Sequence, residues 1–402
     1  IAVGREVRAQ ADRAGWTKEL VVEACRARLP DGAIAWIDAT VVLAGDRPGY
    51  PPLLGTGGND GRFEFSNNFM QRLAEILWPT GGRRSAPDLP KAWIDEALFG
   101  DGHAPRVKAS VGQFDPGAAG GANSSPLGAA DSLVNPWDWV LLLEGALLFA
   151  SAAARRLGAG SRGRASMSFT FDASPVGFAS AAEGEASRGE VWTPLWPRPA
   201  TAPEVAHLMG EARADWRGHT ATSGIDMARA VASLGVDRGV AAFVRHTIVE
   251  RFGRNMLAVP AGRLSVRAEP ALPVTGQLDP WLTRVRRVDQ KPATVSSRLR
   301  RVDSALYRVA TRGGPQALQA VLEEVAELEV AVGRSAAFRD QARIAPLSDL
   351  KAGDWLSHLD DGTPEFHVAS GLASLHDDEG AGLRRCLRAV KPRIGESDLE
   401  WT

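Results

Sequence analysis

The segment that says most about the architecture of this chain is WLTRVRRVDQKPATVSSRLRRVDSALYRVATRGGPQALQAVLEEVAELEV, residues 281–330. It keeps helical spacing along its length, and its first half is basic while its second half is acidic. The pattern predicts a mainly helical C-terminal region over residues 281–402, basic at first and then acidic.

The basic half belongs to a longer basic block. Between Arg238 and Arg312 there are 15 Lys or Arg against 5 Asp or Glu, although the whole chain carries a net charge of −1. One basic block in a balanced chain is typical of a protein that contacts a phosphate backbone. The alternative is an arginine-rich helix that only faces water. The candidate backbone contacts are Arg284, Arg286, Arg287, Arg298, Arg300 and Arg301.

Upstream of this region, residues 201–280 are predicted to be helical with one short hairpin. Residues 225–252 have the spacing of one or two helices with a break near Gly235. The segment NMLAVPAGRLSV, residues 255–266, is expected to turn back on itself as the hairpin.

The strongest single helix signal is NPWDWVLLLEGALLFASAAARR, residues 135–156. Asn135 is a suitable N-cap, and Pro136 occupies the first helical position. Arg155 and Arg156 would then close the C-terminal end, where cations suit the helix dipole. The charges inside this segment favour a buried helix over a membrane span, which needs about 20 mostly apolar residues.

Residues 1–200 are predicted to be a mixed α/β part with irregular loops. Residues 1–29 have helical spacing, AIAWIDATVVL (33–43) is typical of a strand or a buried segment, and RASMSFTFDASPVGFASA (164–181) alternates like a strand. RGEVWTPLWPRPATAPEVAHLM (188–209) is expected to be a Trp-Pro loop that leads into a helix. Together with the helical C-terminal part, these segments predict an α+β fold.

Two glycine-rich loops are the candidate ligand contacts of the first part. They are GTGGNDGR within residues 51–72 and GQFDPGAAGGANSS at residues 112–125. Glycine permits close backbone approach to a ligand or phosphate, and the neighbouring amides could hydrogen-bond to base edges or sugars. Either loop could instead be a structural turn. The residues predicted to bind nucleic acid here are Gly57, Gly58, Asn59, Arg62, Asn67, Asn68, Gln71, Gln113, Asn123 and Ser124.

The sequence offers no recognised catalytic motif. The first loop is neither G-x-x-x-x-G-K-[ST] nor G-x-G-x-x-G, the seven histidines show no HExxH spacing, and there is no G-x-S-x-G. We therefore expect no catalytic residue, no cofactor and no metal. The alternative is a metal- or nucleotide-dependent enzyme that uses the glycine-rich loop with Asp60 and would retain its metal or nucleotide on gentle purification. The aromatic residues beside these loops could stack on bases, but such side chains are more often core.

Several collinear segments, spanning about residues 30–260, resemble one family. PPLLGTGGNDGRFEFSNNFMQRL, GQFDPGAAGGANSS, NPWDWVLLLEGALLFA, RGEVWTPLWPRPAT and GVDRGVAAFVRHTIVERFGRN are together similar to the large subunit of the type I-G (formerly I-U) CRISPR Cascade effector complex. Family members are longer at both ends, and the part beyond about residue 270 matches little. The glycine-rich N-terminal region of the family has no counterpart here, which agrees with a first residue that is not Met and with a fragment of a longer protein.

The resemblance implies a non-catalytic subunit of an RNA-guided DNA surveillance complex in antiviral defence. Such a subunit recognises the protospacer-adjacent motif, assists duplex opening and R-loop formation, and helps to recruit the helicase-nuclease, while guide pairing supplies most of the sequence discrimination. The implied partners are the guide RNA, double-stranded target DNA, the backbone and guide-end subunits and the helicase-nuclease, without a membrane. The resemblance also implies that the tail could pack like the helical small-subunit bundle that some large subunits carry. A purely structural subunit is the remaining alternative.

Composition agrees with a protein that has a substantial core. Apolar residues make up 44% of the chain and charged residues 24%. The two cysteines, Cys25 and Cys386, lie far apart without zinc-like spacing, which fits a reducing compartment. From this and from the absence of a signal peptide, we expect a cytoplasmic protein.

Overall fold

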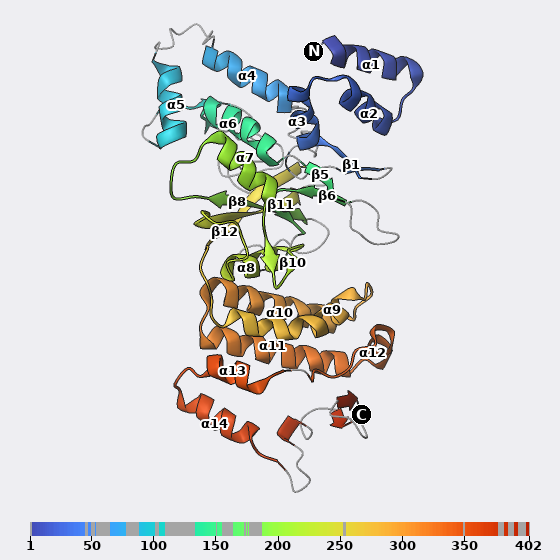
Figure 1. The fold of residues 1–402 in the computed structure, drawn as a ribbon, viewed down its shortest axis with the longest axis vertical. Helices are drawn as coiled ribbons and strands as arrows, with labels where there is room; N and C mark the ends of the chain where they lie inside the picture. The colour runs from blue at the N-terminus through green and yellow to red at the C-terminus, as the bar shows by residue number, and fades with distance from the viewer. Residues whose placement is uncertain are drawn as a thin grey trace. The chain divides into compact units, whose positions relative to one another are not determined.

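The computed structural model of the chain is a mixed α+β protein whose C-terminal part is mainly helical, which confirms the predicted fold class (Figure 1). It describes residues 2–44, 47–49, 53, 65–77, 88–100, 104–108, 133–149, 151–154, 164–172, 174, 176, 187–251, 255–348, 350–376, 382–384, 390–392 and 399–401. Within these ranges, no helix has the length and apolar character needed to cross a bilayer.

The chain forms two compact units. The first comprises Ile1–Ala173, Ala182–Arg213 and Phe243–Arg263, and the second comprises Ser174–Ala181, Ala214–Ala242 and Leu264–Thr402. The ranges predicted from the sequence, 1–200, 201–280 and 281–402, are each continuous, whereas both units combine separated segments.

The first unit is built around a four-stranded sheet with the order β12-β11-β8-β7. Its strands are β7 (Thr170–Phe171), β8 (Ser187–Leu195), β11 (Ala242–Arg251) and β12 (Asn255–Ser265). Gly189 in β8 has φ +134°, and a Cβ there would lie 3.1 Å from the carbonyl oxygen of Phe171, so the close approach of β7 requires glycine.

A buried ion pair joins the neighbouring strands β8 and β11 of this sheet. Arg245 of β11 donates from Nε to Glu190 Oε2 at 2.8 Å and from Nη2 to Glu190 Oε1 at 2.5 Å, and both side chains are fully buried. The indole of Trp192 donates to the same carboxylate at 3.0 Å. These bonds satisfy two charges that could not otherwise be buried.

Three predictions are wrong in this sheet. Residues 188–195 are strand β8 rather than a loop, the second half of residues 225–252 is strand β11 rather than helix, and residues 255–265 are the single strand β12 rather than a hairpin. β8 and β11 are buried on both faces, which hides the alternation that marks a strand. β12 is an edge strand, so it accommodates Pro260 without turning.

The first unit also contains seven α-helices and a 3-10 helix among its described residues. They are α1 (Ala2–Ala14), α2 (Lys18–Arg28), α3 (Asp31–Thr40), α4 (Phe65–Leu77), α5 (Leu89–Phe99), α6 (Pro136–Ala146), the 3-10 helix η2 (Leu147–Phe149) and α7 (Ala202–Glu211). The predicted cap of α6 is confirmed, because Asn135 accepts from the Trp137 amide at 3.0 Å and Pro136 follows it. The segment at 33–43, expected to be strand or buried, is mostly helix α3.

Small two-stranded antiparallel sheets complete the first unit. They are β1 (Val42–Ala44) with β2 (Arg47–Gly49), β3 (Val107–Lys108) with β4 (Leu133–Val134), and β5 (Ser151–Ala154) with β6 (Arg164–Met167). The predicted helix at 135–156 is therefore too long: it ends after η2, and residues 151–154 pair with β6 instead. Helix and strand cannot be separated by periodicity in a run as uniformly apolar and Ala-rich as this one.

The second unit is mainly helical. Its helices are α8 (Gly224–Ala232), the 3-10 helix η4 (Leu272–Leu278), α9 (Asp279–Arg287), α10 (Ala293–Arg312), α11 (Pro315–Gly333), α12 (Ala336–Ala342), α13 (Ala352–Leu359) and α14 (Pro364–Ala373). Two antiparallel strand pairs accompany them: β9 (Asp215–Trp216) with β10 (His219–Thr220), and β13 (Val390–Pro392) with β14 (Leu399–Trp401). Figure 1 shows α10 and α11 lying side by side. Helices α9, α10 and α11 confirm the helical pattern predicted over residues 281–330.

We predict that the buried pair in the sheet is essential for the stability of the first unit. Replacing Arg245 with Met leaves the Glu190 carboxylate buried without its partner, and should reduce the free energy of unfolding by about 3–5 kcal/mol in a denaturant titration. Arg8→Met, which breaks an exposed pair with Asp12, is the matched control and should cost little. Equal losses in the two variants would refute this assignment.

Candidate nucleic-acid interface

The six arginines predicted as backbone contacts fall into two groups. Arg286 and Arg298 are partly buried and paired with carboxylates of neighbouring helices. The other four, on α9 and α10, have exposed side chains: Arg284, Arg287, Arg300 and Arg301.

The paired arginines join helices together. Arg286 Nη2 lies 2.5 Å from Asp303 Oδ1, linking α9 to α10. Burial lowers the pKa of Arg286, but the nearby carboxylates, Asp303 first, raise it above its ordinary value overall, so this guanidinium stays charged. Arg298 lies 3.2 Å from Glu327 and 3.7 Å from Glu324, linking α10 to α11. Both charges are largely neutralised inside the protein and offer little to an external phosphate.

The exposed face of α10 extends the predicted basic set. Arg308 and Arg312 are also exposed, and the spacing of Arg301, Arg308 and Arg312 places them on one side of the helix. Arg301 and Arg308 are seven residues apart, which corresponds to about 10 Å along the helix axis. Arg308 and Arg312 were not among the predicted contacts, although the seven-residue spacing between Arg301 and Arg308 is visible in the sequence.

A polar hollow lies beside the C-terminal end of α9. It has a volume of about 600 Å³ and is lined by Arg284, Arg287, Val288, Asp289, Gln290 and Gln341. Two cations, one carboxylate and two neutral amides therefore line one recess, with a net positive charge. Guanidinium groups can bind phosphate and amides can hydrogen-bond to bases, so the lining has the chemistry of a nucleotide contact. Gln290 and Gln341 come from different segments, and their proximity could not be read from the sequence.

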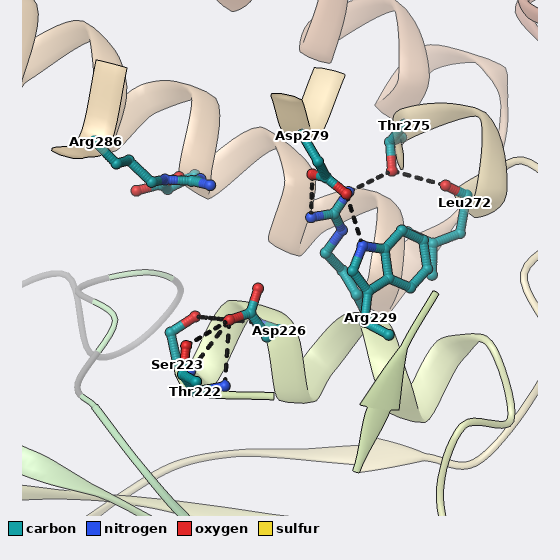
Figure 2. Close-up of polar contacts among 10 residues, drawn as sticks. Thr222, Ser223, Asp226, Arg229, Leu272, Thr275, Asp279 and Arg286 are labelled. Carbon is teal, nitrogen blue, oxygen red and sulfur yellow. Dashed lines mark hydrogen bonds and ion pairs between the residues drawn. The ribbon is translucent and has the colours of Figure 1, made fainter. Parts of the chain in front are cut away.

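The position of α9 depends on a buried arginine beneath it. Arg229 of α8 is 1% exposed, donates from Nη1 to Asp279 Oδ1 at 2.8 Å and from Nη2 to Thr275 Oγ1 at 3.2 Å (Figure 2). The Trp216 indole donates to the other oxygen of Asp279 at 2.9 Å, and its ring lies 4.2 Å from the guanidinium carbon. Burial lowers the pKa of Arg229, and Asp279 opposes that shift.

The start of α8 is fixed by its own cap. Asp226 and Ser223 form a reciprocal capping box, and the Asp226 carboxylate also accepts from Thr222 (Figure 2). Asp279 is at once the first residue of α9 and the partner of Arg229. Consequently, α8 and η4 hold the beginning of α9, and α9 carries Arg284 and Arg287 toward the hollow.

The glycine-loop predictions are mostly untouched by the structure. Gly57, Gly58, Asn59, Arg62, Gln113, Asn123 and Ser124 lie outside the described residues. Asn67, Asn68 and Gln71 lie in α4, where Gln71 is exposed while Asn68 is 2% exposed in the region where α4 packs against α6. Asn68 is therefore poorly placed for contact with a ligand on the surface.

The first unit contains a separate, apolar hollow of about 350 Å³. It lies among α6, α7 and the sheet, and His246 is the titratable residue among its described lining residues. Burial lowers the pKa of His246, partly offset by a hydrogen bond to the Val244 backbone. Among the described residues, no three His, Cys, Asp or Glu side chains gather in a way that could hold a metal ion.

Four tryptophans are candidate stacking platforms, Trp137, Trp139, Trp192 and Trp196, and two of them belong to the core. Trp139 is 4% and Trp192 0% exposed, so neither can stack on a base at the surface. Trp137 is half-buried and donates to the Pro90 carbonyl at 3.2 Å. Trp196, 39% exposed at the edge of the apolar hollow, is the exception among the four tryptophans considered.

Comparison with known proteins adds no family. A scan against protein-family models finds no match, and a search of curated proteins finds no significant match.

We predict that Asp279 is needed to keep Arg229 buried. Asp279→Asn removes the balancing charge, and should reduce the free energy of unfolding of the second unit by about 3 kcal/mol. Asp340→Asn, at an exposed position of α12, is the control and should leave the unfolding midpoint nearly unchanged. The assignment is wrong if thermal or denaturant unfolding cannot distinguish the two variants.

We also predict a pH dependence that originates at His246. Because its pKa in the folded state lies below the ordinary value, the unfolded chain takes up the proton first as the pH falls below about 6.5. Stability contributed by the neutral ring is complete above that pH and is lost as the pH falls toward the lowered pKa. Denaturant titrations across this range should therefore show a smaller loss for His246→Leu than for the parent, whereas the exposed His219→Leu should behave like the parent. A His246→Leu variant with the parent's pH dependence would contradict this.

Proposed function

We propose that this protein is a non-catalytic, nucleic-acid-binding large subunit of a cytoplasmic CRISPR RNA-guided surveillance complex of type I-G. In that role it recognises the protospacer-adjacent motif of the target duplex, assists duplex opening and R-loop formation, and helps to recruit the helicase-nuclease. Its partners are the guide RNA, the target DNA and the backbone and guide-end subunits. The resemblance of the segments between about residues 30 and 260 supports the family part of this proposal.

The observation that carries the nucleic-acid part is the exposed arginine face of α9 and α10. We define it as the exposed residues Arg284, Arg287, Arg300, Arg301, Arg308 and Arg312. Over Asp279–Arg312 there are nine Lys or Arg against three Asp, and Arg286 and Arg298, which pair with carboxylates of neighbouring helices, are not part of this face. The rise of about 10 Å between Arg301 and Arg308 matches roughly three phosphates of one strand, which are spaced by about 3.4 Å along the duplex axis.

The neighbouring hollow supports contact with more than the phosphates. Gln290 and Gln341 are neutral donors and acceptors next to Arg284 and Arg287. A phosphate held by the two guanidinium groups would bring its sugar or base within reach of the amides. In this account the arginine face sets affinity and register, while pairing with the guide RNA supplies sequence discrimination.

The arginine face gives a direct test through the salt dependence of binding. Each phosphate contact contributes about 0.9 to the slope of log K against log salt on duplex DNA, so replacing Arg284, Arg287, Arg301 and Arg308 with Glu should reduce the slope by about 3 to 4 and weaken binding. Fluorescence anisotropy with a labelled duplex at several salt concentrations measures both quantities.

The matched control reverses the same number of exposed charges elsewhere. Arg5, Arg8, Arg13 and Arg198 are exposed and belong to the first unit, so a variant with Glu at these four positions has the same net charge as the test variant. The control should keep the parental slope. An unchanged slope in the test variant, or an equal reduction in both, would remove the arginine face from the interface.

A further inference from the structure

Helix α14 carries an apolar surface that nothing in the described chain covers. The helix, Pro364–Ala373, contains no buried residue. Val368 is 62% exposed and Leu372 is 50% exposed, and Leu375, just beyond the helix, is 55% exposed. Because they are four and three residues apart, these three side chains lie on one face.

A helix of this length does not normally hold its shape without packing. Isolated helices shorter than about 12–15 residues are marginal in water, and most helical stability in proteins comes from burial of an apolar face. The first turn of α14 has local support, because Thr363 accepts from the Phe366 amide at 3.3 Å and Asp361 accepts from the Thr363 hydroxyl at 2.6 Å. Phe366 and Ser370 are half-buried, whereas Val368, Leu372 and Leu375 are left uncovered by the described part of the chain, so a partner could bury that face.

Helix α13, which precedes α14, is attached to the second unit by hydrogen bonds. Trp355 of α13 is 3% exposed and donates to Gln277 at 3.1 Å, and Gln277 also donates to Asp354 at 2.8 Å. Gln319 of α11 donates to the Leu359 carbonyl at 2.8 Å. These bonds attach α13 to the second unit, and the short turn after Leu359 then presents α14.

The charges around this apolar face are mainly acidic. Residues 350–376 contain four carboxylates and one lysine, and within the described part of the chain none of the four carboxylates forms an ion pair. Three of them lie in or next to the turn before α14: Asp360, Asp361 and Glu365. Such a surface repels a phosphate backbone and attracts a cationic partner.

We propose that α14 and the adjoining turn form a docking site for a basic amphipathic helix of a partner protein. The partner's apolar stripe would pack on Val368, Leu372 and Leu375, and its Lys or Arg residues would face Asp360, Asp361 and Glu365. This is the helix-on-helix mode of recognition, in which apolar anchors provide affinity and flanking charges select the partner. The proposal is independent of the arginine face and of nucleic-acid binding.

Two synthetic peptides test the site on the full-length chain. Both have about 14 residues and the same Leu stripe, with Lys at the polar positions of one and Glu at those of the other. Titration should show that the Leu/Lys peptide binds and weakens with salt, while the Leu/Glu peptide binds much less well. Hydrogen exchange should slow at the amides of residues 364–375 when the Leu/Lys peptide is bound. Absence of binding, equal binding of both peptides or unchanged exchange at α14 would overturn the proposal.

Variants at the apolar stripe identify the location. Val368→Ser with Leu372→Ser should weaken Leu/Lys peptide binding by about tenfold or more, because two anchors lose their buried area. Both side chains are already exposed, so the thermal midpoint of the free protein should not fall. Met70→Ser with Leu77→Ser, at 61% and 58% exposed positions of α4, is the matched control and should bind as the parent does.

Other occupants give distinguishable results. If the parent self-associates with increasing concentration in sedimentation experiments and Val368→Ser with Leu372→Ser does not, a second copy of the chain covers α14 and the proposal is wrong. Binding of neutral lipid vesicles that is lost in the same variant would also overturn it, because the occupant would then be a membrane surface.

Discussion

The second unit depends on one buried charge, the guanidinium of Arg229. An arginine stays protonated in proteins, so its burial is possible only where the surroundings supply a carboxylate and further acceptors or a π face. Asp279, Thr275 and the ring of Trp216 do so, and they belong to three different segments of the chain. Their shared partner therefore fixes the hairpin β9–β10, helix α8, η4 and the start of α9 against one another. The direction of α9, and with it the position of its exposed arginines, follows from that constraint.

The arginines of this protein have different tasks according to where they lie. Arg229 and Arg245 are buried and paired, each with an indole nearby. Arg286 and Arg298 join neighbouring helices through carboxylates. Those exposed at the surface of α9 and α10 are the ones to which the proposed function assigns the phosphate contacts. The basic block in the sequence thus contains both paired arginines and exposed arginines. Its net charge therefore overstates the positive charge that is exposed to a ligand.

Periodicity predicted the helices of the second unit well because α10 and α11 are amphipathic over several turns. The cap at Asn135 was predictable for the same local reason, since the bond from the Trp137 amide spans two residues. Strands β8 and β11 were not predicted, because burial of both faces and a buried Arg245 remove the alternating pattern. Tertiary pairing likewise changed the end of the predicted helix at 135–156, where residues 151–154 pair with β6.

The candidate site was predictable only in part. The sequence identified the basic block, but it could not separate Arg286 and Arg298 from their exposed neighbours, because the partners Asp303, Glu324 and Glu327 are brought close by helix packing. The hollow next to α9 combines residues 284–290 with Gln341, which are too far apart in the sequence to be linked by a motif. The acidic residues beside α14, Asp360, Asp361 and Glu365, are visible in the sequence. Only the exposed fractions of Val368 and Leu372 reveal an uncovered apolar face.

The most direct test of the proposed function is duplex binding by a reconstituted guide-RNA complex with and without this protein. The measurement uses two salt concentrations and targets with either a permissive or a scrambled flanking motif, because salt changes the phosphate contribution while the flanking motif changes the sequence contribution. We expect that adding the protein gives tight, salt-sensitive binding to the permissive duplex and not to the scrambled one. Equal affinity with and without the protein would contradict it and would leave a structural subunit as the better explanation.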